Sequence, residues 1–463
     1  MRSLPFLKPL DMGKGRVSST LFMLAVPTMI SLFFQNLYSL VDIMFVSWVG
    51  TTPLAALSLS VPVFYLALAL VRGIGLGTTT LMSSARGEGD EKKADSLAEA
   101  SLPLMLLILC PLLILTLPGP CKYIFSLLGA KGEVLLTVHD YALWLSLSFP
   151  VMGYAMLCES ILMSHGDSVT PMKGMVLGNI LNLILDPVLI FSANMGVEGA
   201  SLASLIGWIF TAYYLRRKLI TYGYSVPVVK KTGDMIKQWR RIWGIGYVIT
   251  LSMIVVTFSV GAMNWFLARE GAAAIGAWNL MSRVELMIVL PFMGISHSLV
   301  PFVGFNFGRR NKERIIAAVK TSLCIELSGM AVFSLLFIYF SKEIIGLFNP
   351  GQDVLQWGAY ALRASATAYI FFPFELTLMG TAQGLRRPVF SLVTSIFRQI
   401  FLRIPLAALL YGMSGVKGIY WSHPLSMVAG GLLSAALIMV LLRNENILDR
   451  SRMSQHHTGA NDE

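Results

Sequence analysis

Two aspartates lie inside long apolar runs of this 463-residue chain. Asp42 falls within "NLYSLVDIMFVSWVG" and Asp186 within "NLILDPVLIF". A carboxylate at the centre of a membrane helix costs about 2.5–3.5 kcal/mol on insertion scales, so such a group is usually paired or functional. Helical spacing predicts that Tyr38 and Gln35 share a stripe with Asp42, and that Asn182 shares a face with Asp186.

The sequence around Asp186 supplies further oxygen atoms. Pro187 cannot donate a backbone N–H, so carbonyl groups one turn earlier are freed as ligands. The next run, "GASLASLIGW", brings Ser201 and Ser204 to one side. Carboxylates, an amide, a phenol and a hydroxyl together suit a hard cation such as Na+, or a proton shared between paired acids. The competing interpretation is structural: each aspartate would pair with an arginine and hold helices together.

The C-terminal half carries its own charged set: Glu285, Glu375, Arg283, Arg398 and Arg403. Arg283 and Glu285 are two residues apart and cannot share a helical face. For this set, a structural ion-pair network and a substrate site remain equally open. The other charges at membrane depth are interpreted as lying near helix ends, where they reach the interface: Arg72, Glu159, Lys320, Glu326 and Arg363.

The elements that position these residues are membrane spans. The chain is 55% hydrophobic and 13% charged, with a mean hydropathy of +0.69, whereas soluble proteins carry about 25% charged residues. We predict an all-α polytopic membrane protein with twelve transmembrane helices. The segments are 18–47, 54–81, 96–117, 134–161, 169–191, 199–219, 242–268, 275–302, 316–340, 353–380, 388–411 and 416–442.

Charge and motifs exclude several classes of function. The net charge is +11, but the basic residues fall in short loops, so they indicate topology rather than nucleic-acid binding. By the positive-inside rule both termini are cytoplasmic. The chain has no HExxH, GxSxG or Walker A motif and no CxxC pair, so we expect neither an enzyme nor an ATP-driven pump. "GIGLG" at Gly73 is interpreted as helix packing, not as a dinucleotide loop.

The two halves repeat. Residues 50–93 align with residues 271–314 at a constant shift of 221, without a gap. We predict an N-lobe at 1–220, a linker at 221–241, a C-lobe at 242–443 and a polar tail at 444–463. Two parallel repeats of six helices usually hold a substrate between them. Because Asp42 maps to Met263 and Asp186 approximately to Arg403, the acidic pair belongs to one half only, which argues against a purely architectural role.

Taken together, several motifs resemble the multidrug and toxic compound extrusion (MATE) transporters over nearly the whole chain. They are "VPTMISLFFQNLYSLVDIMFVSWVG", "LAALSLSVPV", "GIGLGTTTLMSSARGEGD", "NLILDPVLIF", "GVEGASLAS", "GISHSLVPFVGFNFG" and "QGLRRP". The first of them resembles the prokaryotic branch that has an aspartate on helix 1.

The resemblance implies two six-helix lobes around a V-shaped cleft. It also implies export of lipophilic, often cationic compounds in antiport with Na+ or H+ by alternating access. In that branch the N-lobe ion site comprises residues that match Asp42, Tyr38, Asn182 and Asp186, with Ser204 in place of a threonine. Any bound Na+ would take Asp42, Asn182, Asp186 and Ser204 as ligands.

The resemblance also assigns Pro27 to bending of the first helix and Gln35 to the substrate cleft, with Glu285 and Glu375 as acids of the C-lobe. We expect a monomer in the inner membrane of a prokaryote, with no cofactor beyond the coupling ion. The alternative is a lipid-linked precursor flippase, in which Arg283, Arg398 and Arg403 would hold a pyrophosphate. A receptor or scaffold is less favoured because it does not require an acidic pair at mid-depth, and an intramembrane enzyme is less favoured because the sequence offers no nucleophile or metal set.

Overall fold

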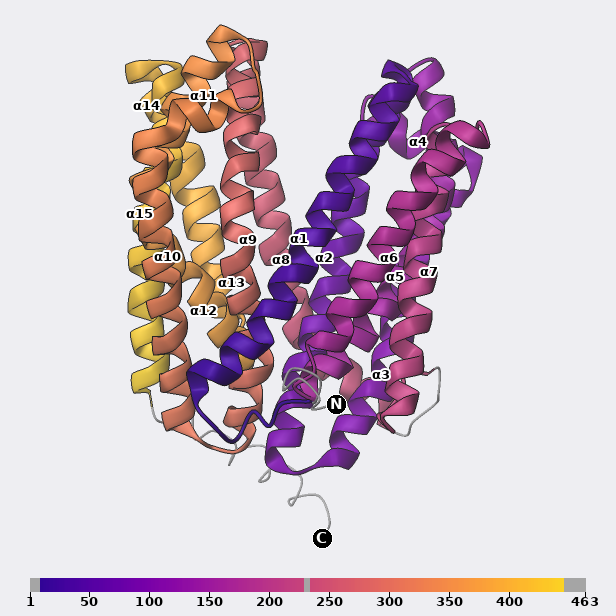
Figure 1. Cartoon of the computed structure of the whole chain (residues 1–463), viewed down its shortest axis with the longest axis vertical. Helices are drawn as coiled ribbons and strands as arrows, with labels where there is room; N and C mark the ends of the chain where they lie inside the picture. Colours follow the sequence, from indigo (N-terminus) through magenta and orange to yellow (C-terminus); the bar gives the residue numbers. More distant parts are fainter. Residues whose placement is uncertain (1–8, 229–233, 445–463) are drawn as a thin grey trace, which may run out of the picture. The chain divides into compact units, whose positions relative to one another are not determined.

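The computed structural model describes residues 9–228 and 234–444, which form helices with no strand among them (Figure 1). The N-terminal half contains α1 (Val17–Val49), α2 (Thr51–Glu88), α3 (Glu91–Leu109), η2 (Cys110–Thr116), α4 (Pro118–Leu127), α5 (Glu133–Ser164), α6 (Val169–Pro187), η3 (Val188–Ser192) and α7 (Val197–Thr221). The C-terminal half contains α8 (Met235–Ala268), α9 (Ala272–Gly308), α10 (Lys312–Gly346), α11 (Gln352–Ala366), η4 (Tyr369–Phe371), α12 (Phe372–Gly384), α13 (Val389–Ile396), η5 (Phe397–Arg403), α14 (Ile404–Ser414) and α15 (Val416–Arg443).

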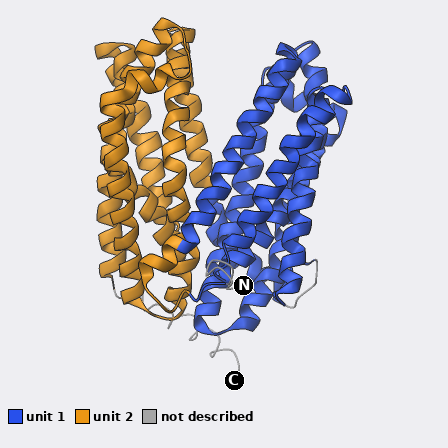
Figure 2. Cartoon of the chain, viewed as in Figure 1, with its two compact units in different colours: residues 1–11, 23–250 blue, residues 12–22, 251–463 orange. Residues whose placement is uncertain are grey.

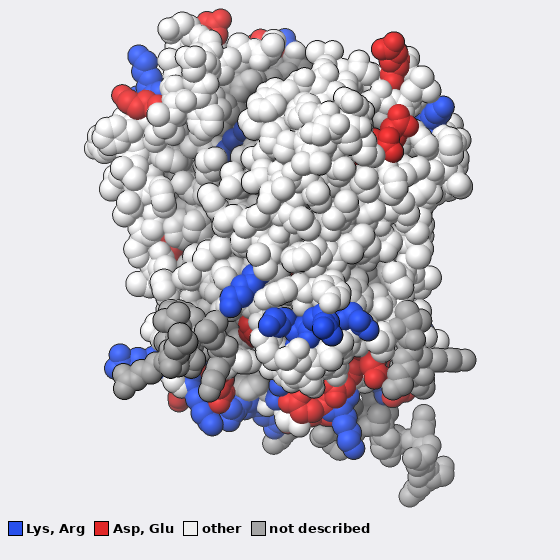
Figure 3. All heavy atoms as spheres, turned by 45° about the vertical axis from the view of Figure 1, so that its right-hand side comes forward, with Lys and Arg blue, Asp and Glu red and all other residues white. Residues whose placement is uncertain are grey.

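These helices account for the twelve predicted spans. Within the described residues, ten helical stretches are long and apolar enough to cross a membrane. The other two predicted spans correspond to α7 and to the broken stretch α11–η4–α12, and α4 is a short helix that the sequence did not predict. On the face drawn in Figure 3, charged side chains gather toward the two ends and leave a broad, largely uncharged band between them.

The chain divides into two compact units (Figure 2). Unit 1 comprises residues 1–11 and 23–250, and unit 2 comprises residues 12–22 and 251–463. The first residues of α1 therefore group with unit 2, and the first half of α8 groups with unit 1. The predicted tail lies outside the described residues except for its first residue, as does part of the predicted linker.

The internal repeat is visible in how corresponding helices begin. Gly50 and Gly271 cap α2 and α9 at positions 221 residues apart, both with positive φ. Gly196 and Gly415 cap α7 and α15 in nearly identical conformations, φ 56° and 60°.

Helices α7 and α15 also pack alike at the position three residues after their capping glycines. A Cβ on Gly199 would collide with the backbone of Leu189, and one on Gly418 would collide with the backbone of Leu410. Each half therefore repeats both a turn and a backbone contact.

Small residues bring α2 against the first half of α8 in unit 1. A Cβ on Gly77 would lie 2.8 Å from the carbonyl oxygen of Ile242, and one on Gly246 would lie 2.9 Å from that of Gly73. Thr250 donates a hydrogen bond across the same interface to the carbonyl of Ala69, at 3.0 Å. The prediction that "GIGLG" serves helix packing is confirmed.

Candidate cation-binding site

Helix α1 carries the first carboxylate of the site. The helix is continuous from Val17 to Val49 although Pro27 lies inside it, and the hydroxyl of Ser31 donates to the carbonyl of Pro27 at 3.1 Å. Asp42 lies beyond this point and is only 9% exposed. Its Oδ1 has no hydrogen-bond partner among the described residues. Asp42 thus offers a buried carboxylate oxygen that can bind a cation or accept a hydrogen bond.

Helix α6 carries the second carboxylate at its C-terminal end. Asp186 is completely buried, and Asn182, one turn earlier, is 3% exposed. The side-chain nitrogen of Asn182 lies 3.4 Å from Asp186 Oδ1. After Pro187 the chain continues as the π-helix η3 instead of an α-helix. Proline removes one backbone N–H from the helical hydrogen-bond pattern. The wider π-helical turn lies directly beside the carboxylate, and such turns are frequent at functional positions.

Two glycines hold α6 and α7 together at this depth. A Cβ on Gly178 would lie 2.9 Å from the carbonyl oxygen of Gly207, and a Cβ on Gly207 would lie 3.0 Å from that of Gly178. This approach brings the half-buried Ser204 within reach of Asn182, with 3.3 Å between Ser204 Oγ and the amide nitrogen. The helix crossing, rather than sequence spacing, therefore places the serine hydroxyl at the site.

The acidic pair forms one electrostatic group with two tyrosines. Asp42 and Asp186 are near enough to repel each other when both are ionised, and Tyr38 interacts electrostatically with both. Tyr141, on α5, does the same and is 8% exposed. Tyr141 was not predicted from the sequence, because its position opposite the aspartates depends on how α5 packs against α1 and α6. Four helices contribute to the group: α1, α5, α6 and α7.

Three buried oxygens of the site have no protein partner within the described ranges: Asp42 Oδ1, Asp186 Oδ2 and Asn182 Oδ1. Buried polar atoms are normally satisfied, so an unpaired set on neighbouring helices indicates a position for a ligand or a proton. No lysine or arginine forms an ion pair with either aspartate in the described part of the chain. Two carboxylates with neutral amide and hydroxyl oxygens suit a small hard cation or a shared proton.

Gln35 and Pro27 are placed apart from this oxygen set. Gln35 accepts a hydrogen bond from Arg72 of α2, at 3.0 Å. Arg72 is half-buried near the middle of α2 and interacts electrostatically with Glu159, so the interpretation that it lies near a helix end is wrong. Pro27 is buried in the first third of α1.

A second polar cluster lies in unit 2 and joins most of the C-terminal candidates. Arg398 pairs with Glu375 at 2.7 Å, and His423 Nε2 lies 3.1 Å from Glu285 Oε1. Glu285 also interacts electrostatically with Arg398 and Arg403. His423, on α15, was missed because a single histidine in an apolar run gives no sequence signal of its partner.

Arg403 belongs to this polar cluster, and Arg283 does not. Arg403 donates to Gln399 at 3.1 Å, and its guanidinium lies 5.0 Å from the ring centroid of Trp278. Both Arg398 and Arg403 belong to η5, a π-helix in the span that corresponds to the one containing η3. Arg283 is exposed, as the two-residue separation from Glu285 implies.

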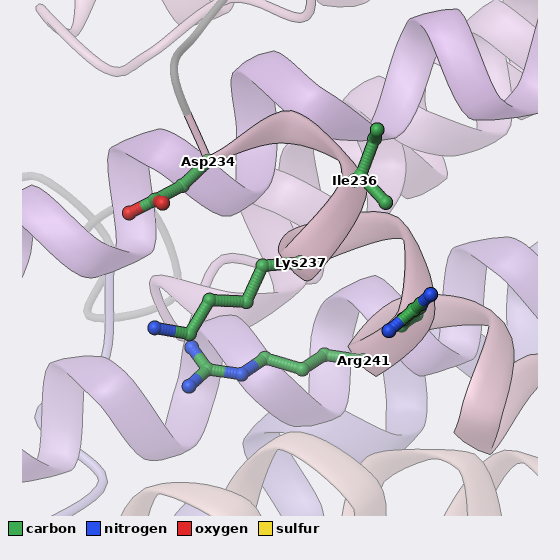
Figure 4. A pocket seen from close by; sticks show the side chains of 5 residues that line it. Asp234, Ile236, Lys237 and Arg241 are labelled. Carbon is green, nitrogen blue, oxygen red and sulfur yellow. The ribbon is translucent and has the colours of Figure 1, made fainter. Parts of the chain in front are cut away.

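An open hollow lies at the start of α8, lined by Asp234, Ile236, Lys237, Arg240 and Arg241 (Figure 4). In this view the side chains of Asp234, Lys237 and Arg241 extend toward the same side. The hollow is formed by exposed side chains around one helix terminus. It fits the solvated basic loop that the topology analysis predicted and is separate from the buried carboxylates.

Fold and site together define an integral membrane protein of two related halves with a buried acidic pair in one of them, and duplicated halves of this kind are common among membrane transporters. The sequence model of the MatE family matches residues 27–188 and 249–409, once in each half. The chain therefore belongs to MatE, the multidrug and toxic compound extrusion family that its motifs resemble. It is a transport protein and not an enzyme.

Known proteins agree with this assignment. The chain is 28% identical to the FAD transporter of Shewanella oneidensis, covering 90% of this chain and 93% of the relative. It is 26% identical to the multidrug export protein MepA of Staphylococcus aureus, covering 95% and 97%. The crystal structure of a variant of the Vibrio cholerae MATE transporter VcmN matches with a TM-score of 0.89 at 22% identity, covering 93% and 98%. That last similarity concerns the fold, twelve transmembrane helices in two lobes.

Proposed function

We propose that this protein exports small lipophilic, often cationic compounds in exchange for an inward flow of Na+ or H+, with Asp42 and Asp186 holding the ion. The observation that carries the proposal is the buried acidic pair, in which each carboxyl group has an unpartnered oxygen, together with the unpartnered oxygen of Asn182. Export of several compounds is also supported by MepA, a relative that is named a multidrug export protein.

Coupling requires that ion and substrate favour different conformations of the protein. An ion bound between Asp42 and Asp186 removes their mutual repulsion and lets α1 pack more closely on α6. Without an ion, the two carboxylates repel each other, and α1 is the element free to respond because Pro27 interrupts its hydrogen bonding. Neutralisation of the pair would thereby change the bend of α1 and release the exported compound on the outer side.

The residues of the site suit both Na+ and H+, but the two ions would bind to different sets of atoms. Na+ would take oxygens from Asp42, Asp186, Asn182 and Ser204, with the remaining ligands from water or backbone carbonyls. A proton would be shared by the two carboxylates, as in other paired acids. The Na+ mode requires the neutral oxygens of Asn182 and Ser204, whereas the proton mode needs only the acids.

The alternative cargo is a lipid-linked pyrophosphate, which requires several unpaired cations. Arg398 is bound to Glu375 and Arg403 to Gln399, so the two buried arginines already have partners. One relative is named an FAD transporter, and FAD therefore belongs among the compounds tested. The drug-export proposal is favoured because neither Asp42 nor Asp186 has a positively charged partner among the described residues, whereas Arg398 is already paired with Glu375.

The proposal includes a setting as well as a mechanism. We place the protein in the cytoplasmic membrane of a prokaryote, as a monomer with both termini in the cytoplasm and no cofactor other than the coupling ion. Excess lysine and arginine in the connections after even-numbered spans supports this orientation. Labelling of single cysteines introduced at Lys92 and Lys131 by an impermeant reagent in intact cells tests it, because only Lys131 should react.

The experiment uses purified protein in proteoliposomes. A Na+ gradient and a pH gradient are imposed one at a time, and uptake of a fluorescent lipophilic cation, of FAD and of a lipid pyrophosphate is measured. We expect the cation to be transported under at least one gradient, and Asp42→Asn and Asp186→Asn to reduce the rate about tenfold or more. Full transport by both variants at equal protein levels would contradict the proposal, as would gradient-driven transport of the pyrophosphate alone.

A further inference from the structure

One fully buried carboxyl group in unit 2 takes part in none of the interactions described above. Glu326 is the fifteenth residue of the 35-residue helix α10 and is 0% exposed. The interpretation that it lies near a helix end and reaches the interface is therefore wrong. It lies near mid-helix, where a carboxylate has no access to water.

Its surroundings supply one hydrogen bond and no positive charge. The hydroxyl of Thr377, on α12, donates to Glu326 Oε2 at 2.8 Å. Oε1 has no partner within the described residues. A buried carboxylate without a cation is strongly disfavoured, and such a group takes up a proton instead. The geometry is that of a neutral acid whose Oε1 carries the proton.

The neighbouring elements carry charged and titratable groups, yet none of those in the described part of the chain forms a hydrogen bond or an ion pair with Glu326. They are Arg283, Glu285 and His297 on α9, Arg363 on α11, Tyr369 in η4 and Glu375 on α12. Lys320, on α10 itself, is exposed. The protonation of Glu326 is thus governed by burial and by Thr377.

Buried hydroxyl groups continue from this pair in one direction. Ser322 lies one turn before Glu326 on α10, and Thr381 lies one turn after Thr377 on α12. Both are 0% exposed, and neither hydroxyl oxygen has a partner among the described residues. Since α10 and α12 run in opposite directions through the bundle, both hydroxyls lie on the side of Lys312 and Gly384. Unsatisfied hydroxyls at such positions are the groups that bind internal water and pass protons.

Helix α12 is fixed on its other side, so a charge at Glu326 would act on α10. A Cβ on Gly384 would lie 2.7 Å from Val303 Cβ, and one on Gly380 would lie 2.9 Å from Leu299 Cβ. The hydroxyl of Ser296 donates to the carbonyl of Leu376 at 2.5 Å. Helices α9 and α12 form a tight pair, and the neutral contact between Glu326 and Thr377 attaches α10 to it.

We propose that Glu326 is a proton-binding site of unit 2, which exchanges its proton through the end of the unit that carries Lys312 and thereby controls the packing of α10 on α12. In the exchange, the O–H bond at Oε1 breaks, the proton passes to water, and the carboxylate remains. The effect on transport rests on the proposed cation-coupled export, whereas the proton site itself does not.

Infrared difference spectroscopy of the purified full-length protein tests the site directly. We expect a carbonyl band of a protonated acid that exchanges in D2O, that is absent in Glu326→Gln and that persists in the control Glu343→Gln, an exposed acid of the same helix. Thr377→Val should shift the band to higher frequency because its hydrogen bond is lost. A spectrum in which Glu326→Gln removes no protonated-acid band, or in which the band that it removes never exchanges in D2O, would overturn the proposal.

Transport in proteoliposomes tests the consequence. Glu326→Gln preserves the size and neutrality of the protonated side chain, so it should fold and yet respond to a pH gradient about tenfold more slowly than wild type. An unchanged response would assign Glu326 to structure alone. Asp42→Asn is measured in parallel to distinguish failure of the two proposals. Full transport by that variant would contradict the proposed function. The infrared result would still decide independently whether Glu326 binds a proton.

Discussion

The amide nitrogen of Asn182 lies 3.3 Å from the hydroxyl oxygen of Ser204, across the interface between α6 and α7. The same nitrogen lies 3.4 Å from Asp186 Oδ1. The other amide atom, the carbonyl oxygen Oδ1 of Asn182, has no partner within the described residues. The serine therefore helps to orient the amide as well as offering an oxygen of its own. This arrangement makes Ser204 a determinant of cation affinity if Na+ is the coupling ion.

Ser204→Ala should weaken apparent Na+ affinity by about 5–30-fold, because one neutral hydrogen-bonding group contributes roughly 1–2 kcal/mol at a buried site. Ser204→Thr is the matched control, since it retains the hydroxyl and should stay near wild type. The measurement is the Na+ concentration that gives half-maximal drug transport, together with the Na+ concentration that raises the Tm of the purified protein. Equal affinities for the alanine and threonine variants would remove Ser204 from the site, and transport driven by pH alone would indicate the proton mode.

The close approach of α6 and α7 depends on glycine. Gly178→Ala should lower stability by about 1–3 kcal/mol, because its Cβ would overlap the carbonyl of Gly207 and the side chain of Thr211. Gly244→Ala is the control: a Cβ at that helical position meets no atom within 4 Å, so it should be neutral or slightly stabilising. Thermal unfolding in detergent compares the two. A loss of cation affinity in Gly178→Ala beyond the stability effect is also expected, since Asn182 and Ser204 move apart.

The sequence was sufficient for the spans and for part of the site. Long apolar runs separated by short charged loops predicted the helices, because hydropathy alone determines which segments are stable in lipid. Helical periodicity placed Asn182 and Asp186 on one face, and their side chains are in contact. The grouping of Asp42 with Asp186 was a hypothesis from their residue types, and the family resemblance supported it; helical periodicity alone could not supply it, because it depends on packing between helices that are distant in sequence.

Contacts between helices account for what was missed. Tyr141 follows His139 and Asp140, and His423 follows Ser422; nothing in a one-dimensional pattern names the residues opposite them. Glu326 was interpreted as lying near a helix end, whereas α10 continues for 20 residues beyond it. The position of a charge along a helix can be read from sequence only when the helix ends are known.

The buried pair Glu375–Arg398 should behave as a coupled unit. Removing one partner, as in Glu375→Gln or Arg398→Met, should cost about 3–5 kcal/mol, because a buried charge is left without its counterpart. The double variant should be less destabilised than the sum of the two single variants. Thermal unfolding of the four proteins completes the cycle. Strict additivity would mean that the 2.7 Å contact contributes nothing, and loss of drug binding without loss of stability would instead assign the pair to the substrate site.

The loop that follows α5 should make stability depend on pH. His165 stacks on Tyr224, with ring centroids 3.6 Å apart, and its Nδ1 lies 2.8 Å from the carbonyl oxygen of Ile161. Arg86 contacts the other ring nitrogen, Nε2. Because arginine can only donate hydrogen bonds, Nε2 must accept and Nδ1 must carry the hydrogen. The contact with Arg86 thus requires the neutral imidazole, whereas Nδ1–H can donate to Ile161 in either protonation state.

Burial, and then the positive charge of Arg86, lower the pKa of His165 to about 4 from its ordinary value of 6.5. The unfolded chain therefore takes up this proton at a higher pH than the folded protein does. The stability is fully present above about pH 6.5 and is lost as the pH falls toward 4, by at most about 3 kcal/mol. The measurement is Tm between pH 4 and pH 8 for wild type and His165→Gln. Because Arg86 also pairs with Glu91, the difference between the two curves is the quantity that reports on His165. The variant should lose the part of the slope between pH 6.5 and 4.5, and parallel curves would show that the imidazole is not held neutral in this loop.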